Sequence, residues 1–134
     1  MEQLREIFYS ESYETYYKKL DKKLQEKFDY VSHIIRTQPV VNSKFVKKLE
    51  GSDFYEARIS MGSNEYRTIL FAIDAESFNQ CSCVLYLNSF QKKDKKQYKS
   101  EIKKAEKIIK NFFCVVFSEH ESNIPSKLDN ADAK

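Results

Sequence analysis

The segment Cys83–Phe90 is a nearly continuous run of apolar side chains, and it constrains the fold more than any other part of the sequence. Successive side chains of a strand point to opposite faces of a sheet, so a strand that is apolar throughout needs cover on both sides. We therefore expect Cys83–Phe90 to be an interior strand with structure packed on each face. The run passes directly into a lysine-rich segment, Gln91–Lys110, whose apolar positions recur at helical spacing.

Two further strands are predicted just before this one. In Phe54–Ser60, apolar and polar side chains alternate, which is typical of a strand with one face on the core. Glu65–Asp74 is rich in isoleucine and phenylalanine, and Met61–Asn64 contains a glycine and predicts a turn. Ala75–Ser82 is polar and predicts a loop. Because short connections join these strands, neighbouring strands are expected to be antiparallel.

The N-terminal third predicts one short strand and a pair of helices. Leu4–Tyr9 is a mixed apolar segment that fits an edge strand, and Ser10 or Ser12 can cap the following helix. Apolar residues at helical spacing indicate two helices: Tyr13, Tyr16, Tyr17 and Leu20 in the first, and Leu24, Phe28, Val31 and Ile35 in the second. Pro39 ends the second helix, and Asn42–Leu49 predicts one or two further helical turns.

These elements define the α+β class, with an N-terminal strand and helical hairpin, an antiparallel sheet of about four strands and a C-terminal basic helix. A chain of 134 residues is long enough for one hydrophobic core and short for two. We expect residues 1–117 to form that single domain. The remaining segment, 118–134, is polar and aperiodic and is predicted to be a disordered tail.

Positive charge is concentrated on the C-terminal helix. From Gln91 to Lys110 there are nine lysines and three acidic residues, whereas the whole chain has a net charge of only +3. Such a concentration is typical of a surface that meets phosphates, although a solvated amphipathic helix shows the same pattern. The apolar stripe from Tyr98 to Phe112 makes the helix body a packed element. The lysines of its first turn, in Lys92–Lys96, are therefore the better candidates for a functional role.

Several chemistries are excluded by the composition. Two glycines cannot form a glycine-rich phosphate loop or a dinucleotide fingerprint. Cys81 and Cys83 lack a second cysteine pair, and His33 and His120 are isolated, so we expect no metal and no cofactor. No segment approaches the roughly 18 apolar residues of a membrane span, and the N-terminus lacks a signal-peptide pattern. The odd number of cysteines favours reduced thiols. A cytoplasmic protein without a membrane partner is expected.

Arg58 and Arg67 lie on two consecutive predicted strands joined by a short turn. If that turn is the tip of a hairpin, the two guanidinium groups can stand close together on the sheet. Arginine offers a fixed fork of donors that matches phosphate oxygens, so two forks and the nearby lysines would form an anion site. Alternatively, Arg58 forms an ordinary surface ion pair with Glu56 or Glu65.

A series of short motifs follows in order from Leu49 to Phe113. It consists of Leu49 and Gly51, Tyr55 to Arg58, Tyr66 and Arg67, Phe90 with Lys92 and Lys93, and Glu101, Ile102 and Ala105. This series resembles the RelE/ParE superfamily of bacterial toxins, particularly its phage-derived HigB-like branch. That branch has Leu-x-Gly, Tyr-Glu-Leu-Arg, Tyr-Arg, Phe-x-Lys-Lys and Glu-Ile-x-x-Ala in this order. The resemblance covers residues 4–113 and implies a RelE-like fold.

The sequence departs from the branch at two places. Ala57 replaces the leucine of Tyr-Glu-Leu-Arg. The branch continues its basic junction as Lys-Lys-Thr-Gln-Lys-Thr-Pro, whereas Asp94 and Lys95 follow Lys93 here and no proline begins the helix. Asp94 can replace that proline as a signal for the helix start, because aspartate is a favoured N-cap.

The resemblance implies a toxin of a type II toxin-antitoxin system, held inactive by a cognate antitoxin, that cleaves mRNA without a metal, usually on the ribosome. Attack of the ribose 2′-hydroxyl on the adjacent phosphate builds negative charge, which fixed cations stabilise. On this basis Arg58 and Arg67 contact the scissile phosphate. The general acid and base are to be found among Glu56, the junction lysine Lys93 and Tyr98. The side chains expected to hold RNA are those of Lys92, Lys93, Lys95, Lys96 and Tyr98.

Two other functions remain open from the sequence. A ParE-like toxin that acts on a protein target such as gyrase, or an inactivated relative, would have the same fold, with Arg58 and Arg67 as structural residues. A simple nucleic-acid-binding domain would contact phosphates through its basic helix and cleave nothing. Its affinity would fall steeply with salt.

Overall fold

The computed structural model describes the backbone of residues 3–119 and the side chains as far as Phe113. Within this range the elements are β1 (Glu6–Tyr9), α1 (Glu11–Lys18), α2 (Lys22–Thr37), β2 (Val46–Lys48), β3 (Tyr55–Met61), β4 (Asn64–Ala72), the short 3-10 helix η1 (Phe78–Gln80), β5 (Cys83–Lys92) and α3 (Gln97–Glu119). The α+β class predicted from the sequence is confirmed.

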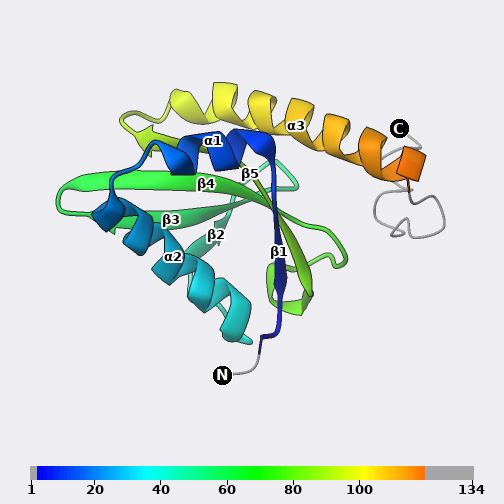
Figure 1. Ribbon diagram of the computed structural model, residues 1–134, viewed down its shortest axis with the longest axis horizontal. Helices are drawn as coiled ribbons and strands as arrows, with labels where there is room; N and C mark the ends of the chain where they lie inside the picture. The colour runs from blue at the N-terminus through cyan, green and yellow to red at the C-terminus, as the bar shows by residue number, and fades with distance from the viewer. Residues whose placement is uncertain (1–2, 120–134) are drawn as a thin grey trace.

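The five strands form one mixed sheet in the order β1-β5-β4-β3-β2 (Figure 1). The strands β2 to β5 pair antiparallel with their neighbours, as their short connections predict. β1 pairs parallel with β5, with Glu6 opposite Cys83. The predicted antiparallel sheet of about four strands is therefore corrected to five strands with one parallel pair. No hairpin joins β1 to β5, so chain connectivity did not determine their relative direction.

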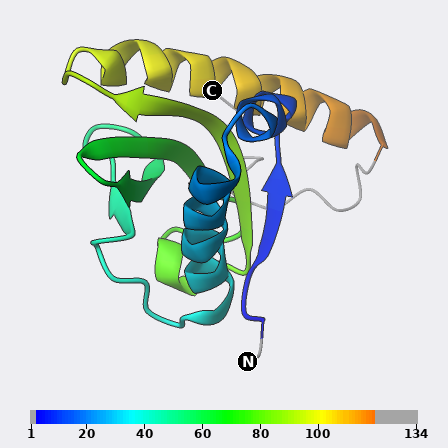
Figure 2. The same cartoon turned by 60° about the vertical axis from the view of Figure 1, so that its left-hand side comes forward.

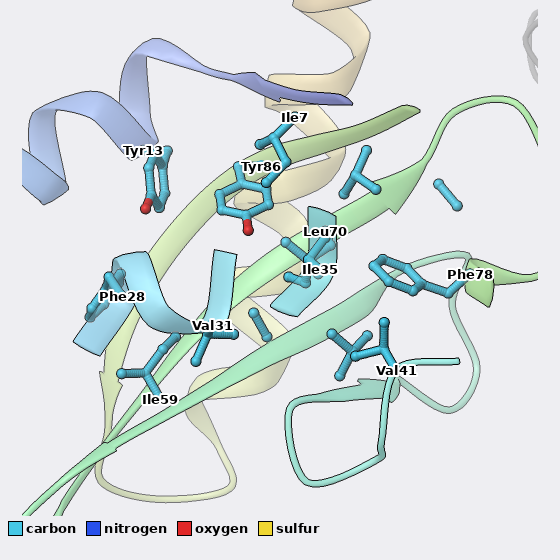
Figure 3. Close-up of a cluster of buried hydrophobic side chains, with 14 of the residues drawn as sticks. Ile7, Tyr13, Phe28, Val31, Ile35, Val41, Ile59, Leu70, Phe78 and Tyr86 are labelled. Atoms are coloured by element: carbon cyan, nitrogen blue, oxygen red, sulfur yellow. The ribbon is translucent and has the colours of Figure 1, made fainter. Parts of the chain in front are cut away.

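Helices cover both faces of the sheet. One core cluster lies between the sheet and the helices α1 and α2, and Figure 3 shows part of it. A second cluster lies between the sheet and α3, and α2 and α3 are on different sides of the sheet (Figure 2). In β5, Val84 and Tyr86 belong to the first cluster, whereas Leu85 and Leu87 belong to the second. The prediction of an interior strand packed on each face is confirmed.

Local signals in the sequence define the ends of the N-terminal helices. Ser10 is the N-cap of α1 and Asp21 is the N-cap of α2, and each side chain accepts a hydrogen bond from the amide three residues on. This bond satisfies one of the amides that a helix start leaves without a partner. α2 ends at Thr37, and Gln38 is extended ahead of Pro39, as expected for a residue before proline.

The segment Asn42–Leu49, which the sequence predicts as helical turns, contains a strand instead. A turn closed by the Asn42 side chain, which accepts from the Lys44 amide (2.8 Å), leads into β2 at the edge of the sheet. Val46 lies opposite Ala57 of β3. Val46 and Leu49 are both buried, as the prediction required. Two buried residues three positions apart fit a helical turn, but they also fit a short strand and the residue that follows it. Pairing with β3, the next strand along the chain, decided the outcome.

A buried arginine just before β1 connects three parts of the first layer. Arg5 is 2% exposed, and its side chain packs over the Phe78 ring, 5.3 Å from the centroid. Its guanidinium donates to the carbonyl oxygens of Ile35, Gln38, Pro39, Phe78 and Asn79 at 2.6–3.4 Å. Arg5 thus ties β1 to the end of α2 and to η1.

An irregularity in β5 turns two consecutive side chains toward α3. The register between β4 and β5 shifts between Thr68 and Leu70. Leu87 packs in the cluster beneath α3, and the next residue, Asn88, donates to the backbone oxygen of Glu101 in α3 (3.1 Å). A β-bulge inserts one residue and changes the phase of the strand. It therefore places Phe90, three residues after Leu87, on the α3 side of the sheet.

The C-terminal helix is longer than the sequence predicts. α3 continues to Glu119, so the first two residues of the predicted tail are helical. The rest of that tail, 120–134, lies outside the described residues. Across the described range, no helix combines the length and apolar character that crossing a membrane requires.

Candidate active site

The β3–β4 hairpin brings the two predicted arginines together. Gly62 has a positive φ of 62° in the turn, a conformation that glycine adopts without strain. The register that follows places Arg58 directly opposite Arg67. Directly opposed residues of an antiparallel pair have Cβ atoms about 4.5–5.5 Å apart on the same face. The predicted proximity of the two arginines is therefore confirmed, and both lie on the face that α3 covers.

Arg67 is enclosed, with only 1% of the residue exposed. Its Nε donates to the Tyr98 hydroxyl (3.2 Å) and lies 3.4 Å from Oε1 of Glu56. Its Nη1 donates to Oε1 of Glu65 (3.2 Å) and to the Tyr66 carbonyl oxygen (3.0 Å). Burial of a charge is tolerable where it is paired and hydrogen-bonded, as it is here. Arg67 thereby connects β3, β4 and the first turn of α3.

Glu56 is the centre of this cluster. It is 5% exposed, and its Oε1 accepts a hydrogen bond of 2.5 Å from the Tyr98 hydroxyl. The Tyr98 ring packs edge to face on Phe90, with centroids 5.5 Å apart. Burial and the hydrogen bond to Glu56 raise the pKa of Tyr98 to about 12. The hydroxyl is therefore protonated at neutral pH and can act as the donor to the carboxylate.

Arg58 is the more accessible of the two arginines. Its side chain is 31% exposed, and its Nε lies 3.7 Å from Oε2 of Glu56. The surface ion pair that the sequence left open is thus present, together with the pairing of the two arginines across the hairpin. Because the Arg58 side chain is partly exposed to solvent, its guanidinium can donate to an anion without rearrangement of the core.

Glu65 belongs to the cluster, although the sequence did not single it out as a site residue. Its Oε1 accepts from Arg67, and its Oε2 accepts from the Ser60 hydroxyl (2.7 Å), the residue opposite it in the hairpin. The Ser60 hydrogen bond and the Arg67 guanidinium lower the pKa of Glu65 against the opposing effect of partial burial. The sequence could have pointed to Glu65 through its spacing of two residues from Arg67, since residues two apart on a strand point to the same face of the sheet.

The predicted RNA-binding lysines lie on the connection between β5 and α3. Lys92 is partly buried at the end of β5, and Lys93, Lys95 and Lys96 are exposed. Side chains order this connection: Gln97 Oε1 accepts from the amides of Lys93 and Asp94, and Asp94 Oδ1 accepts from the amide of Lys96. In the described part of the chain, no hydrogen bond or ion pair joins these four ammonium groups to the cluster. Hydrogen bonds and ion pairs therefore join Arg58, Arg67, Glu56 and Tyr98, whereas the lysines border this cluster, with Lys92 opposite Glu65 in the β4–β5 register.

The thiols and histidines do not join this site. Cys81 and Cys83 are free, and burial raises the pKa of both thiols, which disfavours the reactive thiolate. His33 is exposed on α2, and His120 lies outside the described residues. No group of three or more metal-ligating side chains occurs among residues whose positions are described. The chemistry available is that of two arginines, two carboxylates and a tyrosine.

Comparisons with solved structures identify the fold. A mutant of the E. coli toxin RelE in the free state matches 77% of this chain and 97% of its own, with a TM-score of 0.53 and 18% identity. The intact E. coli RelBE toxin-antitoxin complex contains a chain that matches 66% of this one and 96% of its own, with a TM-score of 0.47 and 18% identity. The first match defines a RelE-like fold.

A family model gives a more specific assignment. The model described as "Phage derived protein Gp49-like (DUF891)" matches residues 15–110. The chain belongs to this phage-derived Gp49-like family, a RelE-like toxin family. The resemblance drawn from the sequence motifs to a phage-derived branch of the RelE superfamily is confirmed. A search of curated proteins finds no significant match to the sequence.

Proposed function

We propose that this protein is the toxin of a type II toxin-antitoxin system and a metal-independent endoribonuclease that cleaves mRNA on the ribosome, in the cytoplasm. The observation that supports this function most is the convergence of Arg58, Arg67, Glu56 and Tyr98 on one face of a RelE-like sheet. Two guanidinium groups beside a carboxylate and a phenol suit the transfer of a phosphoryl group between hydroxyls.

In this proposal each residue has a distinct role. Glu56 accepts the proton of the ribose 2′-hydroxyl, whose oxygen then attacks the adjacent phosphorus. Arg58 and Arg67 stabilise the negative charge that develops on the phosphate oxygens. The bond from phosphorus to the 5′ oxygen breaks, leaving a 2′,3′-cyclic phosphate, and Lys93 supplies the proton that the departing oxygen requires. Tyr98 contacts the RNA beside the reacting phosphate.

The lysines of the β5–α3 connection hold the RNA backbone in this proposal. Replacing Lys95 and Lys96 together with alanine is expected to reduce the slope of log affinity against log salt by roughly 1.4, because each lost phosphate contact to a single strand removes about 0.7. The measurement is a titration of a short RNA at several salt concentrations. The matched control is the double alanine variant of Lys44 and Lys47, exposed lysines at the β2 edge. An equal loss of slope in both variants would contradict the assignment.

A cognate antitoxin is the protein partner in this proposal. Such a partner accompanies the toxin role proposed here for a member of the Gp49-like family. The product of the adjacent reading frame is the natural candidate to test. Co-expression is expected to restore growth and to yield a stable complex, and failure of the purified proteins to associate would count against this partner.

The experiment that tests the function is inducible expression followed by mapping of mRNA 5′ ends. New ends inside coding regions, in phase with codons, are expected if cleavage takes place on the ribosome. Ends without codon phase would place cleavage on free RNA and contradict the ribosomal part. Intact messages together with arrested replication would overturn the nuclease and favour a protein target such as gyrase.

A further inference from the structure

Arg67 has no exposed donor face comparable with that of Arg58. Tyr98 Oη lies 3.2 Å from Arg67 Nε, and Glu56 Oε1 lies 3.4 Å from the same nitrogen. A phosphate oxygen that binds an arginine Nε needs a position at hydrogen-bond distance from it. Tyr98 Oη already occupies such a position. An RNA phosphate can therefore take the hydrogen bond of Arg67 Nε only after the tyrosine hydroxyl has moved.

We propose that Tyr98 is a gate: without RNA its hydroxyl takes the place of a phosphate oxygen at Arg67, and RNA binding displaces it by moving the first turn of α3. The inference deepens the proposed function, since it takes an RNA phosphate as the ligand of Arg67. It also implies an order in which the two arginines bind the phosphate. Arg58 meets the phosphate first, and Arg67 is added when the gate opens.

The first turn of α3 is held differently from the rest of the helix. Its two backbone bonds to the preceding connection, Gln97 to Asp94 and Tyr98 to Lys95, are both 3.3 Å long, beyond the usual range. One turn later, Glu101 is 8% exposed and accepts from Asn88 of β5 (2.8 Å to Oε1). The body of the helix is thus anchored to the sheet at Glu101. The first turn is held to β5 by the Gln97 side chain, which donates to the Gln91 carbonyl oxygen (3.0 Å), and by packing of the Tyr98 ring on Phe90. Opening of the gate has to break these contacts and can leave the anchor at Glu101 in place.

The closed gate lowers the affinity for RNA by competing with the phosphate. When a protein binds only in a minor state, the apparent dissociation constant rises in proportion to the rarity of that state. The Tyr98 hydroxyl makes one bond to a carboxylate and one to a guanidinium, and one such charge-assisted bond corresponds to roughly a tenfold change in equilibrium or more. Removing the hydroxyl should therefore favour the open state by about that factor.

The test is Tyr98→Phe, which removes the hydroxyl and keeps the ring that packs on Phe90. The probe is a short RNA with 2′-O-methyl sugars, which binds but cannot be cleaved. About tenfold tighter binding than wild type is expected. The matched control is Ser100→Ala in the same helical turn, whose hydroxyl bonds only to the Gln97 carbonyl oxygen among described residues, and whose affinity should equal that of wild type. Unchanged or weaker binding by Tyr98→Phe overturns the gate.

A second variant shows whether the gain comes from Arg67. In the Arg67→Lys background, Tyr98→Phe should give no gain, because the fork that receives the phosphate is absent. An equal gain in that background would overturn the gate. Both arms measure binding, so they separate the two proposals: a gate without cleavage of any natural RNA by wild type would contradict only the nuclease.

Discussion

Replacing Arg58 with alanine is expected to lower the rate of mRNA cleavage by roughly 100- to 1,000-fold, the usual effect of removing one donor that stabilises developing oxyanion charge. Arg58 is the informative position because its side chain is 31% exposed and it makes a loose ion pair with Glu56. The free energy of unfolding should therefore change by less than about 1 kcal/mol. The measurement is single-turnover cleavage of mRNA on programmed ribosomes, with urea denaturation of the same preparation.

Arg36→Ala is the matched control for this prediction. Arg36 is on α2, on the opposite layer, where it donates to the Tyr9 hydroxyl (2.6 Å). Its replacement removes the same charge and should leave the cleavage rate within about twofold of wild type, because exposed charges separated by more than about 10 Å are largely screened. If cells that express Arg58→Ala are inhibited as strongly as cells that express wild type, the proposed mechanism is wrong.

Replacing Arg5 with methionine is expected to destabilise the protein by about 3–5 kcal/mol, the range for breaking a buried charged network. Methionine preserves much of the length and the contact with Phe78 but leaves the carbonyl oxygens of α2, the following loop and η1 without their donor. Unpaired buried polar groups are costly because they lose water without gaining another partner. No ion pair of Arg5 is found among the described residues, so the guanidinium depends on these carbonyls.

The measurement for Arg5 is urea denaturation, with Lys47→Met as the control for loss of an exposed charge. The control should change the unfolding free energy by less than about 0.5 kcal/mol. Arg5→Lys should recover part of the loss, because an ammonium group has three donors where the guanidinium has five. A loss below about 1 kcal/mol for Arg5→Met would show that water replaces the guanidinium, in contradiction to its structural role.

Most of the fold could be predicted from the sequence where a local pattern determined it. The helical stripes of α1 and α2, the alternation in β3 and the double-sided apolar run of β5 each reflect burial that acts on neighbouring residues. β2 was missed because the spacing of its apolar residues also fits a helical turn, and the parallel pairing of β1 was missed because its partner β5 lies far along the chain. The bulge near Asn88 has no sequence signal of its own.

The candidate site was predictable to a similar degree. The proximity of Arg58 and Arg67 follows from a short turn between two strands, which is a local property. The enclosure of Arg67 depends on where the first turn of α3 docks, because Tyr98 comes from that helix. Arg5 could not be recognised, since a single arginine before an edge strand normally indicates a solvent-exposed position.

The parallel pair β1–β5 has a consequence for the timing of synthesis. Glu6 and Cys83 are partners although 77 positions separate them. β1, the first strand to be synthesised, therefore cannot pair until β5, the last strand, has been synthesised. Contacts at such separation form late, and a nascent chain cannot complete them before β5 has left the ribosomal exit tunnel. Tyr98 emerges later still. A translating ribosome should therefore hold an incomplete sheet and an unassembled site until nearly the whole domain has been made. Under the proposed function, the partly synthesised chain is then inactive toward the ribosome that makes it.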